Sequence, residues 1–468
     1  MARDRAPLLL LAATLVVIVV AGVALGTGLV KLSQTIEASP SASAEPTSSA
    51  VAQTSPNASA IPSAAPSAPA NEVIGRVLHA AADGLRLRTE ASASGEIVAT
   101  LRAGQRMGIV SGPIAAEGMD WYEVRIGPGD LAGWVASGAD GSWVRLVNDG
   151  AVAFARSASG RSSVALVTPQ GDDAIATLRE GAFLREWTWS PDGSRLAATI
   201  GDTGDSMEAV LIMEPDGTVI ERLDAGMGPA WSPDGSRLAW VDFEGRIVVT
   251  DESLEPAALL DAGRSPHAIA WSPDGSRLAY LAADCPECPP DEPILGDPPI
   301  AVFTIAVDGS DRRQLTSSSI DGLPSWSADG ARIAFLRFDL SGEFPTRLLV
   351  VDADGGEPRE LVDGAAITGG GGWSPDGSRL ALATSEGILI ASPDGAAELM
   401  VASDEETLIT ELQWSPSGRY LVYGTSGSST PDTSLWIVEA DGSGEPRQIS
   451  PSGEGAAQAK WQPVLVAP

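Results

Sequence analysis

The chain has few of the residues that build metal centres, nucleophilic sites or nucleic-acid surfaces. Its 468 residues include two cysteines, two histidines and two lysines, and the net charge is −32. Such a surface repels nucleic acid and anionic lipid headgroups. The sequence also lacks a Gly-x-Ser-x-Gly elbow, a Walker loop and a His-Glu-x-x-His helix. These absences predict no catalytic residue, no cofactor, no metal site and no nucleic-acid partner.

The two cysteines stand in one short segment, Cys285-Pro286-Glu287-Cys288. Outside the cytoplasm, a pair this close most simply forms a disulfide that pins its loop. A zinc site would need two further ligands, and the only histidines are His79 and His267. We therefore predict a disulfide between Cys285 and Cys288.

One long charge-free run lies near the N-terminus. Pro7–Val30 is long enough to cross a bilayer as a helix, and Arg3 and Arg5 precede it. The basic flank predicts a single-pass cell-membrane protein with residues 1–33 as cytoplasmic tip and anchor and the C-terminal domains outside the cytoplasm. A signal peptide cleaved after Ala24 is the alternative. Residues 34–71, rich in Ser, Ala and Pro, predict a disordered linker.

The rest of the chain is organised around the nonapeptide Trp-Ser-Pro-Asp-Gly-Ser-Arg-Leu-Ala. Four identical copies begin at Trp189, Trp231, Trp271 and Trp373. Degraded copies begin at Trp326 and Trp414, and a last echo begins at Trp461. Successive copies are 40 to 55 residues apart. A period of this size predicts a propeller or solenoid.

The nonapeptide itself predicts a hairpin. Proline presets the second position of a type I turn, and glycine accepts the left-handed position that closes it. Apolar residues alternate on both sides, and a second Asp-Gly turn usually follows, which predicts four antiparallel strands per repeat.

This repeat resembles the TolB-type β-propeller family, and the resemblance covers residues 148–468. It implies an all-β fold. The family includes six- and seven-bladed rings. Residues 151–178 contain three strands that lack a first, whereas the Trp461 segment is a first strand without the other three. Pairing them predicts seven blades; six remains the alternative if Trp461 lies in a tail.

Residues 72–147 have a different pattern of short strands, ending in Trp121-Tyr122-Glu123-Val124 and Gly133-Trp134-Val135. This resembles a bacterial SH3-like β-barrel. The resemblance implies a site for a cell-wall peptide or glycan lined by Trp121, Tyr122 and Trp134. The segment Thr89-Glu90-Ala91 departs from the Ser-Gly-Pro that is common in that family. One or two of these aromatic residues could instead fill the small core.

The propeller region holds most of the acidic surplus, close to −30 charges. The insertions, and the aspartates of successive fourth-to-first-strand connections, are expected on one face; these aspartates are Asp224, Asp261, Asp321, Asp363 and Asp404. We predict that this rim binds a protein partner with a cationic surface. The sequence thus favours a membrane-anchored extracytoplasmic recognition or scaffold protein. The alternative is a propeller hydrolase or lactonase that uses channel carboxylates and a divalent metal.

Overall fold

The computed structural model describes the chain in the ranges 77–126, 131–139, 142–158, 161–168, 177–180, 183–201, 209–215, 217–284, 298–317, 320–338, 346–362, 367–393, 395–402, 407–427, 433–450 and 455–466. The expected anchor, the linker and both cysteines lie outside these ranges. Within them every regular element is a β-strand, as the all-β prediction requires. None of the described segments is a helix long and apolar enough to span a bilayer. Residues Ala68–Pro468 form one compact unit.

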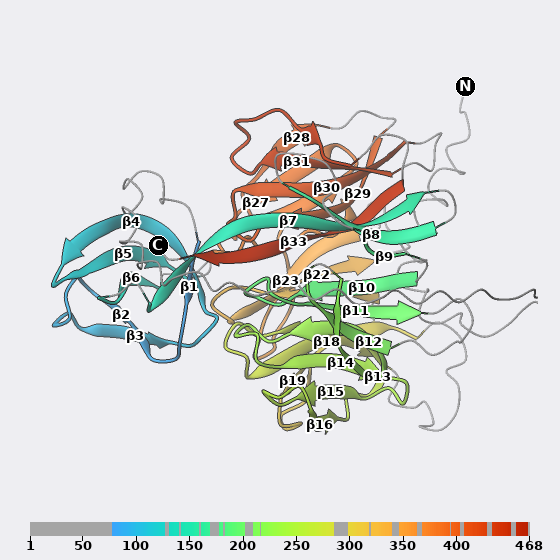
Figure 1. The fold of residues 1–468 in the computed structure, drawn as a ribbon, viewed down its shortest axis with the longest axis horizontal. Coiled ribbons are helices and arrows are strands. Elements are labelled where there is room, and N and C mark those ends of the chain that lie inside the picture. Colours follow the sequence, from blue (N-terminus) through green and yellow to red (C-terminus); the bar gives the residue numbers. More distant parts are fainter. Residues whose placement is uncertain are drawn as a thin grey trace, which may run out of the picture. The chain divides into compact units, whose positions relative to one another are not determined.

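The first strands build a small sheet with its own core (Figure 1). Its strand order is β3-β2-β6-β5-β4-β1-β7. Leu78, Leu87, Met107, Tyr122 and Val135 are fully buried in one cluster, since alternate residues of each strand face inward. The strands are β1 (Val77–Ala80), β2 (Leu85–Arg88), β3 (Ile97–Leu101), β4 (Arg106–Ala116), β5 (Met119–Arg125), β6 (Ala132–Ala136) and β7 (Val144–Ala158).

Strand β7 belongs to this sheet and to the repeat region at once. Its beginning pairs with β1, where Leu146 lies opposite Leu78. Its continuation pairs with β8 on one side and with the C-terminal strand β33 on the other. The expected boundary between residues 147 and 148 therefore falls inside a continuous strand. Backbone hydrogen bonds of this shared strand join the small sheet to the repeats.

The repeat region consists of antiparallel units that begin with the strand ending at the repeat tryptophan. β13 serves two units, because its first part pairs with β12 and its last part with β14. The strands are β8 (Arg161–Val167), β9 (Thr177–Glu180), β10 (Phe183–Trp189), β11 (Leu196–Gly201), β12 (Ala209–Met213), β13 (Val219–Trp231), β14 (Leu238–Asp242), β15 (Ile247–Thr250), β16 (Pro256–Leu260), β17 (Arg264–Trp271), β18 (Arg277–Ala283), β19 (Ile300–Ala306), β20 (Arg313–Gln314), β21 (Ile320–Trp326), β22 (Arg332–Phe338), β23 (Thr346–Asp352), β24 (Arg359–Glu360), β25 (Ile367–Gly369), β26 (Leu380–Thr384), β27 (Gly387–Ala391), β28 (Ala397–Ala402), β29 (Thr407–Trp414), β30 (Tyr420–Gly427), β31 (Thr433–Glu439), β32 (Arg447–Gln448) and β33 (Gly455–Val466).

The Ser-Pro-Asp-Gly segment forms the predicted turn between the first two strands. In the first copy the Gly193 amide donates to the Ser190 carbonyl at 2.8 Å, and Gly193 has a φ of 70°. The Ser190 hydroxyl donates to the Asp192 carboxylate at 2.6 Å. Burial alone would raise the pKa of Asp192, but hydrogen bonds from Ser190 and Ser194 outweigh it and lower that pKa. The polar residues of the motif are thus accounted for by the turn.

The repeat tryptophans join neighbouring units. The indole N–H of Trp271 donates at 2.9 Å to the carbonyl of Ala230, the residue before the preceding repeat tryptophan. Trp326 and Trp414 make the equivalent bonds to Ala270 and Gly372. The motif arginine adds a second contact between units, since the Arg195 guanidinium stacks 4.7 Å from the Trp231 ring.

The same pattern links the two ends of the repeat region. The Trp189 indole donates at 3.3 Å to the carbonyl of Lys460, the residue before Trp461. Figure 1 shows β7 and β33 side by side, and Trp461 lies opposite Val152 in their register. Trp461 therefore stands to Trp189 as Trp231 stands to Trp271, Trp271 to Trp326 and Trp373 to Trp414.

Candidate binding site at the centre of the repeats

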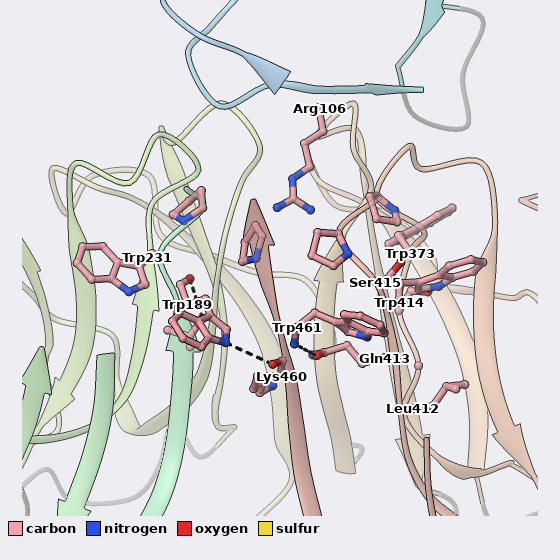
Figure 2. A pocket seen from close by; sticks show the side chains of 17 residues that line it. Arg106, Trp189, Trp231, Trp373, Leu412, Gln413, Trp414, Ser415, Lys460 and Trp461 are labelled. Carbon is pink, nitrogen blue, oxygen red and sulfur yellow. Dashed lines mark hydrogen bonds between the residues drawn. The ribbon is translucent and has the colours of Figure 1, made fainter. Parts of the chain in front are cut away.

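A cavity of about 410 Å³ lies where the first strands of several repeats end (Figure 2). Its walls come mainly from the Trp-Ser-Pro segments: Trp189, Trp231, Trp373, Trp414, Trp461, Pro191, Pro375, Pro416 and Pro463. The turns and inter-repeat bonds hold these side chains in place. The walls are therefore pre-formed and suited to an apolar or planar group.

The charged side chains that line the cavity in the described part of the chain are both basic: Arg106 and Lys460. In Figure 2, the Arg106 guanidinium points into the space between the tryptophan-bearing turns, whereas Lys460 stands on β33. Arg106 is the first residue of β4, so it comes from the small N-terminal sheet. The site thus combines residues of both parts of the compact unit.

The turn before β4 brings Arg106 to the cavity by packing on successive repeats. The Arg102 guanidinium donates to the Asp274 carbonyl at 3.1 Å, and the Gln105 amide donates to the Ala328 carbonyl at 2.9 Å. Gly104 lies so close to the Pro233 carbonyl that a side chain there would overlap it. The small sheet therefore covers the side of the repeats that carries the Trp-Ser-Pro turns.

Burial lowers the pKa values of the basic groups around this contact. It lowers the pKa of the Arg106 guanidinium and of the Lys460 ammonium, although Glu411 and Glu186 partly oppose the shift at Lys460. His79 lies opposite Arg106 in the β1–β4 register. Burial lowers the pKa of His79 to about 4, and the Arg106 charge adds to this shift.

In three of the strands that end at a repeat tryptophan, the backbone is distorted three residues before that tryptophan. Ala268, Leu323 and Gln458 have φ values of 53°, 51° and 59°, which non-glycine residues rarely adopt. The strand register shifts beside each of them. A bulge frees backbone groups from the ladder. At Gln458 the Glu411 carboxylate accepts the freed N–H at 2.8 Å, and burial raises the pKa of Glu411.

A glycine run forms another part of the cavity wall. A Cβ on Gly371 would overlap the carbonyl of Ala381 on the neighbouring strand β26. Gly372 has more room, since its nearest neighbour would be the Ser325 hydroxyl at 3.6 Å. Close backbone approach therefore requires glycine at position 371.

The three aromatic residues predicted to bind a wall ligand do not share one exposed surface. Tyr122 lies in the core of the small sheet, and Trp121 is buried, with its indole N–H donating to the Ala116 carbonyl at 3.2 Å. Trp134 is the partly exposed member of the set. The structure thus assigns Tyr122 to the core, the other role that the sequence allowed.

The structure separates the predicted rim aspartates. Asp261 is exposed. Asp321 has a fully buried carboxylate, paired with the Arg337 guanidinium at 2.8 Å, so it is not available to a partner. The Asp224 side chain, Asp363 and Asp404 lie outside what the structure describes.

The sequence analysis did not identify Arg106 and Lys460 as lining residues of the cavity, because neither belongs to a motif. One signal was present: Lys460 is one of only two lysines.

Four-stranded units joined in series around a central cavity define a β-propeller. Residues 218–465 match the sequence model described as the TolB beta propeller domain. The match covers more than half of the chain, which therefore belongs to the TolB β-propeller family. No curated protein matches the chain.

Several solved structures are similar to it. A putative TolB from Agrobacterium tumefaciens is 20% identical, with a TM-score of 0.37 over 50% of this chain and 83% of that one. An acylaminoacyl peptidase from Pyrococcus horikoshii is 17% identical, with a TM-score of 0.45 over 58% of this chain and 46% of that one. The chain thus spans less than half of the peptidase. An oligogalacturonate lyase in complex with manganese is 16% identical, with a TM-score of 0.45 over 65% of this chain and 85% of that one.

Proposed function

We propose that the chain is a membrane-anchored, extracytoplasmic recognition protein whose seven-bladed propeller binds a protein partner. The observation that carries the proposal is the packing of the small sheet on the Trp-Ser-Pro turns. A partner then docks on the opposite face, where the fourth-to-first-strand connections lie. Binding loops commonly gather on one side of a rigid scaffold.

The count of seven blades is supported by the ends of the repeat region. β33 pairs with β7, and the Trp189 indole bonds to Lys460 as other repeat tryptophans bond to their predecessors. Closure in this way protects sheet edges that would otherwise be open. In the same proposal, residues 72–147 are an SH3-like barrel that binds cell-wall peptide or glycan beside Trp134. Pro7–Val30 anchors the whole in the cell membrane.

The partner's surface is cationic in this proposal. The exposed Asp261 belongs to the proposed face, and the acidic surplus of the chain favours a basic partner. Asp321 is excluded from the binding set, because its carboxylate is buried against Arg337.

Site-specific photo-cross-linking in cells tests the docking face. A cross-linking residue replaces Asp261 in one variant and Asp308, an exposed aspartate of a third-to-fourth-strand turn, in the matched control. We expect the Asp261 variant to capture one protein, with a yield that falls as salt rises. The Asp308 variant should capture far less of it. Equal capture from both positions, or none from either, would overturn the proposal.

A further inference from the structure

The small N-terminal sheet ends in a strand with an open edge. In the described part of the chain β3 pairs with β2 alone, and it stands at the end of the strand order (Figure 1). The backbone groups on its outer side therefore have no partner strand among the described residues. Sheets commonly protect such an edge with lysine or proline. Strand β3 contains neither residue.

The side chains at this edge are apolar and exposed. Ile97 is 44% exposed and Val98 is 43% exposed, although β-branched residues favour half-buried sheet surfaces. Ala99 packs against the core of the small sheet, and Leu101 is buried in that core. The core therefore fixes β3 in place, while the start of the strand presents apolar side chains to solvent. Such an edge is suited to pairing with another strand.

The edge is complementary to a second copy of itself. In an antiparallel register centred on Ala99, each acidic, apolar or small residue of one copy meets a suitable residue of the other: Glu96 lies opposite Arg102, Ile97 opposite Leu101, and Val98 opposite Thr100. The twofold axis repeats each pair, so opposite charges meet twice. Glu96 is exposed, and the Arg102 side chain is 58% exposed. The printed contacts of Arg102 with Asp274 use Nη1, which leaves Nε and Nη2 for a second carboxylate.

We propose that two copies of this chain associate through antiparallel pairing of β3, which joins their small sheets into one. A five-residue edge buries less than the roughly 1,200 Å² of a stable interface. The register shift between Leu87 and Arg88 also weakens regular pairing near Ile97. The association is therefore reversible. It goes beyond the proposed function and uses a different surface, so failure of partner capture at Asp261 would leave it untouched, and the reverse also holds.

Disulfide formation between copies tests the register in the full-length protein with Cys285 and Cys288 replaced by serine. Ala99→Cys places one cysteine of each copy beside the twofold axis, with Cα atoms about 4.5–5.5 Å apart, which a disulfide can bridge. Ile97→Cys is the matched control, because its two cysteines would lie roughly 14 Å apart along the strands. We expect mild oxidation to join copies of the Ala99→Cys variant at least about tenfold faster, although Ile97 is the more exposed residue. Equal rates, or no dimer from Ala99→Cys, would overturn the inference.

A charge variant tests the predicted ion pairs in the Ala99→Cys background. Glu96→Arg would bring two arginines opposite each other on each side of the axis, so disulfide formation should slow about tenfold. Glu90→Arg makes the same charge change at an exposed glutamate before the strand and should leave the rate unchanged. Glu96 is also exposed, so both variants should fold. An unchanged rate in Glu96→Arg, or equal slowing in both variants, would contradict pairing in this register.

Discussion

Replacing Trp461 with alanine should lower the free energy of unfolding by about 3–5 kcal/mol, the usual cost of emptying a buried tryptophan site. Trp461 is 5% exposed and packs in one cluster with Val152 and Phe154 of β7. Its ring also stacks on Tyr420, with centroids 6.3 Å apart. Among the described residues its indole N–H has no hydrogen-bond partner, so the loss is one of packing rather than of a hydrogen bond.

Chemical denaturation of the full-length protein measures this cost, with Trp143→Ala as the control. Trp143 is 50% exposed, so its removal should cost about 1 kcal/mol or less. Hydrogen exchange should also rise in β7 and β10 of the Trp461 variant, because both strands contact β33. If Trp461→Ala and Trp143→Ala differ by less than about 1 kcal/mol, the C-terminal strand is not an integral part of the ring.

Three further predictions concern the described residues. His79 stays neutral in the folded protein, where its pKa is about 4, but it protonates near pH 6.5 in the unfolded chain. The contribution of His79 to the free energy of unfolding is therefore fully present above pH 6.5, and up to about 3 kcal/mol of it is lost as the pH falls towards 4. Denaturation midpoints across this range should show that fall, and His79→Gln should flatten it. Asp321→Ala should cost about 3 kcal/mol, because it leaves the partly buried Arg337 guanidinium without its partner, whereas Asp261→Ala should cost less than about 1 kcal/mol; equal costs would contradict the burial of Asp321. Gly371→Ala should destabilise the protein by at least about 2 kcal/mol through overlap with a neighbouring strand, and Gly372→Ala should melt close to the parent; similar melting of both variants would refute the close backbone approach.

Local chemistry could be predicted from the sequence because it acts over a few residues. The turn at Ser190–Gly193 depends on the preferred φ of proline and glycine and on a serine–aspartate bond two residues apart. The strands beside it follow from alternation of apolar residues. The use of one tryptophan per repeat to contact the neighbouring unit also follows from the period.

Positions set by long-range packing could not be predicted. Asp321 was expected on an exposed rim. Strand β22 instead places Arg337 opposite it, and the Asp321 carboxylate is buried in an ion pair with that arginine. Arg106 reaches the cavity through contacts with repeats more than a hundred residues away, which no local pattern encodes. Trp121 and Tyr122 on β5 are both buried, whereas Trp134 on the neighbouring β6 is partly exposed, and the alternation of residues along the strands does not predict this difference.

The small sheet packs on the Trp-Ser-Pro side of the propeller and supplies Arg106 to the cavity. Cross-linking between cysteines tests it directly in the full-length protein with Cys285 and Cys288 replaced by serine. Arg102 and Asp274 form the contact pair, with a 3.7 Å distance between guanidinium and carboxylate. Arg102 and Asp261 form the control, because Asp261 lies before the other end of the eight-residue strand β17, roughly 25 Å away along a strand. We expect a short bismaleimide to join residues 102 and 274 and to leave residues 102 and 261 unjoined. Equal yields for the two pairs, or no product for the contact pair, would contradict it.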